Sequence, residues 1–137
     1  VELALMAPIL AAVCIGIVDV SMSYSEKMRL EQVAQRTIER VQVSQFKTSM
    51  ETTLESEAQT EAGTGSTADL TYWLECNGTR MTGTSAWTTG CTAGQVIGRY
   101  VQVDVYKAHR PYFVSRWAGS NTNGTITLHG VAGVRIQ

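Results

Sequence analysis

The sequence predicts an α+β protein in which a long N-terminal helix, hydrophobic and then amphipathic, precedes a small C-terminal antiparallel β-sheet. Residues 1–20 are nearly all apolar or small, with one acidic residue near each end. Residues 21–62 are dense in Glu, Lys and Arg, whereas residues 63–137 are rich in Thr, Gly and Ser. We therefore divide the chain into a helical region, residues 1–62, and a β-rich globular domain, residues 63–137.

The leading segment, residues 1–20, is long enough to cross a bilayer, for which about 20 apolar residues are needed. A surface helix of a soluble protein shows only an apolar stripe. Lipid, a bundle of identical helices, or each in turn is therefore expected around this segment. Pro8 removes one helical hydrogen bond and predicts a kink near residues 4–8, and Gly16 adds a second weak or closely packed point.

Beyond this segment a helical period continues. Apolar residues recur mostly at steps of three and four, with charged residues between them: Met28, Leu30, Ala34, Ile38, Val41, Phe46, Met50 and Leu54. Neither Pro nor Gly interrupts the stretch from Ile17 to Ala62. The pattern predicts a single helix from near Val1 to about Gln59, roughly 85 Å long. Charged neighbours such as Arg36 and Arg40 with Glu39 are spaced for pairs within that helix.

The second half of the sequence predicts strands separated by turns. Residues 70–75 are rich in β-formers and end at Asn77-Gly78, a turn signal. Residues 95–106 alternate apolar and polar side chains around Val101, Val103 and Val105, which gives one buried face. Residues 124–136 alternate similarly after a turn at 121–124, and residues 107–119 form an irregular connection. We expect the sheet to pack against the distal region of the helix.

Two cysteines of the β-rich half are spaced to form a disulfide bond. Cys76 and Cys91 flank a loop whose closure contributes roughly 3 kcal/mol in the chain-entropy model. The alternative is a pair of unrelated reduced thiols. A disulfide agrees with an exported location, and Cys14, inside the apolar run, is interpreted as a small hydrophobic residue.

The sequence argues against catalysis and against nucleic-acid binding. A formal net charge of −1 gives no field that attracts nucleic acid. His109 and His129 lack neighbours at the spacing of a metal site or a catalytic triad. We expect no enzymatic activity and no cofactor. Asn77 and Asn123 match the short glycosylation acceptor pattern, for which chance matches are common in a Thr- and Gly-rich chain.

The N-terminal motif carries a family resemblance. Val1-Glu2-Leu3-Ala4-Leu5 with Ala7-Pro8, the continuation Gly16-Ile17-Val18-Asp19-Val20 and the following charged helix together resemble TadE-like pseudopilins. These belong to the tight-adherence (Tad) branch of the type IV pilin superfamily. The likeness is specific over roughly the first forty residues and compatible with the rest. It implies a pilin-like fold, processing by a prepilin peptidase, and handling by an inner-membrane pilus assembly machinery.

The resemblance gives Glu2 the central role. In pilins a glutamate pairs with the α-amino group of a neighbouring subunit and sets the axial register. Pilins usually carry this glutamate at the fifth mature position, so either residues precede Val1 or cleavage is shifted. The alternative for Glu2 is an acidic residue favoured by the dipole at a helix N-terminus. The residues expected to pack in a filament core are Val1, Leu3, Leu5, Met6, Pro8, Ile9, Leu10, Val13, Ile15, Gly16 and Ile17.

The predicted function is a structural subunit that polymerises with copies of itself through residues 1–20 into an extracellular Tad-like pilus. Before assembly it is expected in the bacterial inner membrane, and afterwards on the cell surface. Asp19 is interpreted as the membrane–water boundary. Because Lys27 and Arg29 follow the segment, an outward-facing globular half predicts a basic leader ahead of Val1. Two alternatives stay open: a minor pseudopilin that primes or tips a filament of another subunit, and a bitopic anchor whose β-domain binds an envelope partner.

Overall fold

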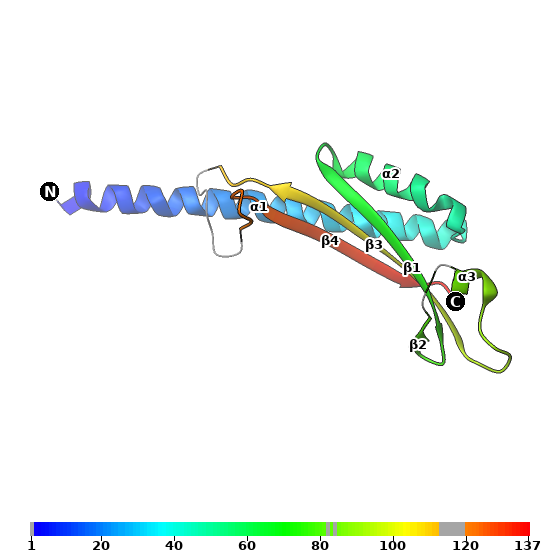
Figure 1. Cartoon of the computed structure of the whole chain (residues 1–137). Coiled ribbons are helices and arrows are strands. Elements are labelled where there is room, and N and C mark those ends of the chain that lie inside the picture. The colour runs from blue at the N-terminus through cyan, green and yellow to red at the C-terminus, as the bar shows by residue number, and fades with distance from the viewer. Residues whose placement is uncertain (1, 82, 84, 113–119) are drawn as a thin grey trace.

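The computed structural model describes residues 2–81, 83, 85–112 and 120–137, and the side chains of residues 2–5 lie outside that description. A long helix is followed by a helical turn, a second helix and a curled sheet (Figure 1). The predicted α+β fold, a long N-terminal helix with a small antiparallel sheet, is confirmed. The elements are α1 (Glu2–Ser44), η1 (Thr48–Met50), α2 (Glu51–Ala62), β1 (Ser66–Cys76), β2 (Thr79–Arg80), α3 (Ser85–Thr89), β3 (Ile97–His109) and β4 (Ile126–Arg135).

The sheet is antiparallel throughout, in the order β2-β1-β3-β4. Side chains of successive strand residues point to opposite faces, and the predicted alternation of Val101, Val103 and Val105 puts all three in the core. Ala68, Leu70 and Leu74 of β1 and Leu128 of β4 are buried with them. β1 and β3 reach beyond the predicted ranges, since β1 already begins at Ser66 and β3 continues to His109, whereas β4 is slightly shorter than predicted. Neither β2 nor α3 was anticipated.

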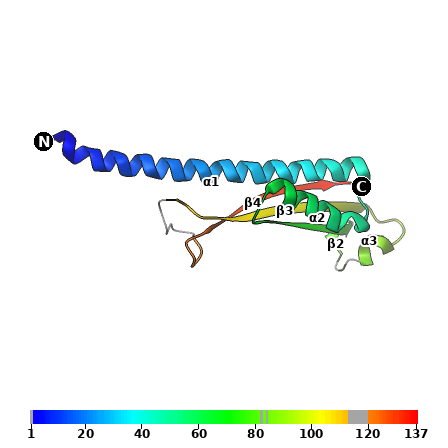
Figure 2. The ribbon, with the colours of Figure 1, turned by 90° about the horizontal axis from the view of Figure 1, so that it is seen from above.

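Both helices cover the same face of the sheet, so the globular region consists of a helical layer and a sheet layer (Figures 1 and 2). The distal half of α1 lies over β4 and β3, and α2 lies over β1. The buried face of α1 repeats at helical spacing, as an amphipathic helix requires: Leu30, Val33, Ala34, Thr37, Ile38 and Val41. The N-terminal half of α1 projects beyond the sheet (Figure 2).

The backbones of α1 and β4 meet at Gly130. A Cβ atom on this residue would lie 2.2 Å from the carbonyl carbon of Leu30 and 2.4 Å from the amide nitrogen of Glu31. No L side chain fits there without moving the helix away from the sheet. Glycine at this position therefore fixes how closely the two layers approach.

The predicted single helix to Gln59 is wrong, because α1 ends at Ser44. Gln45 has a φ of 53°, in the left-handed region that ends helices, and the chain reverses before α2. The reason is tertiary. Phe46 is buried against the rings of Tyr72 and Trp87, with centroids 5.3 and 5.6 Å away, and a straight helix would carry it away from both.

The charge pairs that the sequence predicted within one helix instead join the two helices. Arg36 forms an ion pair with Glu61, and Arg40 forms one with Glu57. The Arg29 guanidinium also donates to the carbonyl oxygen of Glu61 at 3.2 Å, at the C-terminal end of α2. These contacts hold α2 alongside α1.

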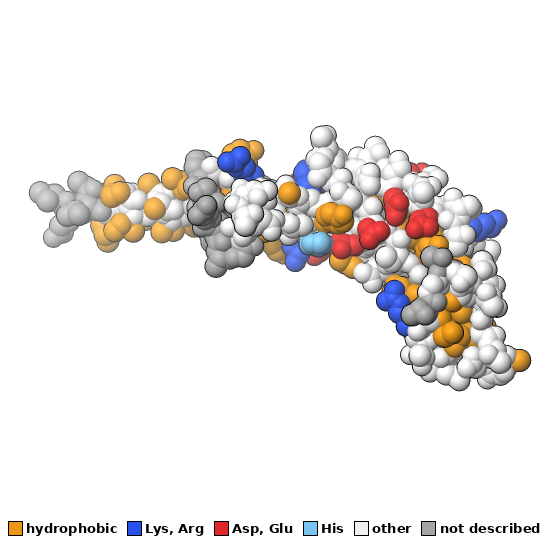
Figure 3. Space-filling model, in the orientation of Figure 1, with side chains coloured by type: hydrophobic (Ala, Val, Ile, Leu, Met, Phe, Trp, Pro, Cys, Tyr) orange, Lys and Arg blue, Asp and Glu red, His pale blue; other side chains and the backbone are white. Residues whose placement is uncertain are grey.

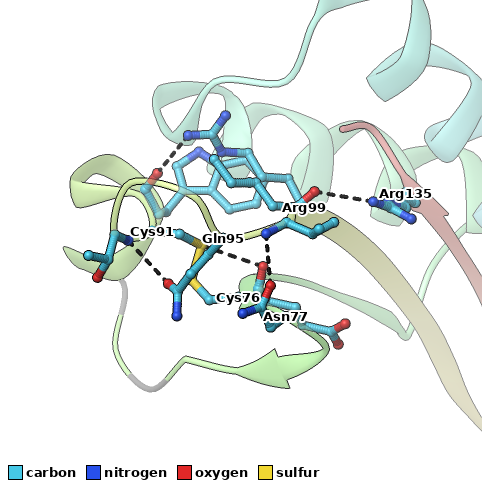
Figure 4. The surroundings of a disulfide bond; sticks show 11 residues. Cys76, Asn77, Cys91, Gln95, Arg99 and Arg135 are labelled. Atoms are coloured by element: carbon cyan, nitrogen blue, oxygen red, sulfur yellow. Dashed lines mark hydrogen bonds between the residues drawn. A yellow bond between two sulfur atoms is a disulfide. The ribbon is translucent and has the colours of Figure 1, made fainter.

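The predicted disulfide bond between Cys76 and Cys91 is present (Figure 4). It ties the end of β1 to the segment that leads into β3. The side-chain oxygen of Asn77 accepts a hydrogen bond from the amide of Val96 at 2.9 Å, and Arg135 donates to the carbonyl of Ile97 at 3.1 Å. The backbone amide of Asn77 also donates to the carbonyl of Val96 at 2.9 Å, so hydrogen bonds and the disulfide together hold the end of β1 beside the segment that leads into β3.

Candidate functional site

The candidate site is the N-terminal half of α1, which carries a continuous cover of exposed apolar side chains. Figure 3 shows hydrophobic atoms around the projecting helix. Single exposed apolar residues are ordinary on protein surfaces, whereas a large contiguous apolar surface marks a contact with another molecule or a membrane. We call these residues the apolar shaft: Met6, Ile9, Leu10, Val13, Ile15, Ile17, Val18, Val20, Met22 and Tyr24.

The shaft is long and apolar enough to cross a membrane. A core helix of a soluble protein passes the same test of length and composition, but such a helix is mostly buried. Only 6% of the apolar window in α1 is buried inside this chain. The shaft is therefore not the core of its own globular domain.

One face of the shaft forms a shallow apolar furrow of about 540 Å³. It is lined by Val13, Gly16, Ile17, Val20, Ser21 and Tyr24, which share one helix face. A Cβ atom built on Gly16 would meet nothing within 4 Å, so the helix backbone is open to close approach there. Small residues at such a point let another helix pack closely in a membrane or a bundle.

The polar boundary of the shaft is built around Asp19. This residue is only 2% exposed, and its Oδ1 atom accepts a hydrogen bond from the backbone amide of Tyr112 at 3.0 Å. The hydroxyl of Ser23 donates to the Asp19 carbonyl at 2.9 Å. The segment that follows β3 is thereby tied to α1 at the end of the apolar run. The interpretation of Asp19 as the membrane–water boundary stays a prediction.

A second contact joins α1 to the sheet about two helical turns further along. Lys107 of β3 donates to the carboxylate of Glu26 at 2.8 Å, and both side chains are about three-quarters buried. The hydrogen bond from Lys107 holds the pKa of Glu26 below its ordinary value, against the opposing effect of burial. The attraction of Lys107 and Arg29 acts in the same direction. This ion pair fixes α1 where it enters the globular region.

The structure brings most of the predicted core-packing residues together on the shaft. Met6, Pro8, Ile9, Leu10, Val13 and Ile17 are exposed there, with Ile15 and the less exposed Gly16. Val1 and the side chains of Glu2, Leu3 and Leu5 lie outside the described residues. Their predicted roles, including subunit register through Glu2, stay predictions.

Sequence reasoning missed the far end of the shaft and its neighbour in space. Val18 and Val20 lie within the predicted segment, residues 1–20, although they were not among the residues expected to pack, and Met22 and Tyr24 extend the apolar surface beyond that segment. The apolar character of all four residues was visible in the sequence. Tyr112 could not have been found, because its place beside Asp19 depends on the fold.

The remaining predicted positions lie away from the shaft. Asn77 and Asn123 are exposed in turns, and their glycosylation stays a prediction. His129 pairs with Asp104 on the outer face of the sheet, at 3.0 Å, and His109 ends β3. Residues 113–119 of the predicted irregular connection lie outside the described residues. Among the residues that the structure describes, no three His, Cys, Asp or Glu side chains are grouped as metal ligands.

A comparison with protein-family models identifies a relationship for the segment that contains the shaft. Residues 1–38 match the family model described as TadE-like protein. The resemblance inferred from the N-terminal motif is thus confirmed, and the matched segment contains the shaft, Asp19 and Glu26. No curated protein and no solved structure matches the chain.

The match to the TadE-like family indicates a pseudopilin associated with a Tad pilus. This family is structural rather than catalytic. Together with the exposed apolar helix, it indicates membrane anchoring and a location related to the pilus.

Proposed function

We propose that this chain is a structural subunit of a Tad-like pilus that polymerises through its apolar shaft. The observation that carries the proposal is the exposed shaft, whose apolar window is only 6% buried within the chain. Before assembly the shaft lies in the inner membrane, and in the filament the shafts of neighbouring copies replace the lipid. The β-rich half then coats the outside. Prepilin peptidase and the inner-membrane assembly machinery are the expected partners.

Physical chemistry explains why both environments suit the same helix. Lipid tails are as apolar as the side chains of neighbouring helices, so the transfer from bilayer to bundle gains little hydrophobic free energy. Packing at the furrow and pairing of Glu2 with a neighbouring α-amino group then set the geometry. A repeated contact that does not close on itself produces an open helical filament.

Substitutions on the shaft test this function. Ile17→Arg places a charge on a side chain that is 63% exposed, and Val131→Arg is a matched control on the outer face of β4, where Val131 is 52% exposed. A charge at the centre of a membrane helix costs about 3 kcal/mol on the insertion scale. We expect the shaft variant to be lost from both the membrane fraction and the sheared surface fraction, and the control to appear in both.

The same experiment separates the alternatives. A minor pseudopilin would make the shaft variant reduce the number of filaments built from another protein. A bitopic anchor would give membrane integration of the unaltered chain with none of it in the sheared fraction. Equal surface levels of the Ile17→Arg and Val131→Arg variants would contradict any role of the shaft in assembly.

A further inference from the structure

Two exposed tyrosines from distant segments of the chain lie near the polar end of the shaft. Tyr24 lies on α1 and is 64% exposed, and Tyr112 follows β3 and is 75% exposed. The contact between the Tyr112 amide and the Asp19 carboxylate, 3.0 Å, places the backbone of Tyr112 beside α1. The fold thus adds a second aromatic side chain at the level where the apolar run ends.

Tyr24 reaches the same level along the helix. Side chains of helical residues incline toward the N-terminus and cover the preceding turn. Tyr24 accordingly closes the furrow next to Val20 and Ser21, immediately beside Asp19 in sequence. Tyr24 and the backbone of Tyr112 therefore both lie near the end of the shaft, although almost ninety residues separate the two tyrosines in the chain.

The length of the shaft fits the thickness of a bilayer. From Met6 to Tyr24 the helix rises about 27 Å at 1.5 Å per residue, close to the ~30 Å of a hydrocarbon core. Basic side chains follow directly: the Lys27 side chain is 50% exposed, and Arg110 is exposed close to Tyr112 in sequence. Along the axis of α1, apolar side chains are thus followed by aromatic and then by basic side chains.

We propose that Tyr24 and Tyr112 form an interfacial belt that lies at the polar–apolar boundary of a phospholipid bilayer and sets how deeply α1 inserts. Tyrosine suits this position because its ring is apolar, whereas its hydroxyl forms hydrogen bonds with water and headgroups. Asp19 is the positioning residue. Asp19 is only 2% exposed and its carboxylate accepts a hydrogen bond from the Tyr112 amide, so this polar group is shielded from lipid. The belt rests on the proposed membrane stage of the shaft.

The test measures depth in vesicles of equal amounts of phosphatidylethanolamine and phosphatidylglycerol. A fluorescent thiol label is attached in turn to three positions of the full chain. The first is Cys14, an exposed free cysteine on the shaft. The second is Tyr112→Cys and the third Val131→Cys, both made with Cys14→Ser. Quenching by lipids that carry a spin label near the headgroup or deep in the acyl chain then reports the depth of each site.

The belt predicts three different results. The label at Cys14 is quenched more by the deep lipid, the label at position 112 more by the shallow lipid, and the label at position 131 by neither. If position 112 behaves like position 131 while Cys14 is quenched, α1 inserts but the belt is wrong. If Cys14 is not quenched either, both the belt and the membrane stage of the proposed function are wrong.

Variants at position 19 test the positioning role. The Tyr112→Cys substitution that carries the label keeps the backbone amide of residue 112, which donates to Asp19, so the contact is still present in the labelled chain. With the label at position 112, Asp19→Ala should lose shallow quenching, whereas Asp19→Asn, which keeps an acceptor oxygen, should retain it. Circular dichroism of each variant checks that the fold persists. Unchanged shallow quenching in a folded Asp19→Ala variant would overturn the role of Asp19.

Discussion

At the residue scale, Gly130 determines the distance between the two layers of the protein. Its missing side chain lets the backbone of α1 at Leu30 pass directly over β4. Interiors are close-packed, so a single added methyl group at such a contact cannot be absorbed without a shift. The packing of α1 on the sheet thus depends on the absence of a Cβ atom at position 130.

We predict that Gly130→Ala destabilises the chain by about 1–3 kcal/mol, the usual range for overpacking a core. The matched control is Gly133→Ala, also in β4, where the nearest atom to an added Cβ is the Val101 carbonyl oxygen at 3.5 Å. Thermal unfolding in detergent, followed by circular dichroism, compares the two. Equal midpoints for both variants would show that α1 does not lie against Gly130.

A second prediction at this scale concerns the pH dependence of the Glu26–Lys107 pair. The pKa of Glu26 is lowered in the folded chain by the hydrogen bond from Lys107. A lowered pKa means that the pair contributes fully above the unfolded value of about 4.3. The contribution is lost as the pH falls through the lower, folded value.

Acid titration of stability checks this sign. We expect the parent chain to lose up to about 1 kcal/mol more than Glu26→Gln on going from neutral pH to below the folded pKa, the scale of a partly exposed ion pair. The variant should be less stable at neutral pH and should show a flatter acid limb. Parallel profiles for the two chains would mean that Glu26 does not gain its partner on folding.

At the scale of elements, the break between α1 and α2 shows the limit of local sequence information. Charge spacing and apolar period continue through Gln45, and neither Pro nor Gly marks an end. The helix nevertheless stops, because Phe46 packs against the rings of Tyr72 and Trp87 and α2 covers β1. Arg36 and Arg40 then find carboxylates on α2 rather than on their own helix. Such partners arise only when the chain is folded.

The left-handed conformation of Gln45 makes a further prediction. An L residue with a φ of 53° is strained, whereas glycine is not. Gln45→Gly should stabilise the chain by about 0.5–1 kcal/mol, after the greater freedom of glycine in the unfolded state is subtracted. Gln45→Ala, which keeps a Cβ atom, serves as the control and should give no gain. A loss of stability on introducing glycine would indicate that α1 continues through this position.

At the scale of the whole molecule, the fold class and the apolar segment could be predicted because they depend on composition and period. The alternation around Val103 indicated the buried face of β3, and the spacing of Cys76 and Cys91 indicated the disulfide bond. The place of Tyr112 could not be predicted, since it depends on where a loop returns to α1. The reversal of α2 was missed for the same reason. The roles of Glu2 and the division of the chain after residue 62 stay predictions.

The two ends of the molecule therefore have different tasks. One end is a two-layer globular region tied by a disulfide bond, and the other is a bare apolar helix that its own domain does not cover (Figure 1). In a monomer in water the apolar side chains of the shaft would stay exposed to solvent. The proposed function covers the shaft with lipid at one stage and with copies of the chain at the next.

The measurement that tests this most directly is electron microscopy of filaments sheared from cells that express the chain, with mass spectrometry of their main component. We predict uniform fibres built chiefly from this polypeptide, with the shafts bundled at the centre of the reconstruction. Fibres made of another protein with only traces of this chain would contradict the structural-subunit role and favour a priming subunit. A chain found only in the membrane, with no fibres, would favour a bitopic anchor.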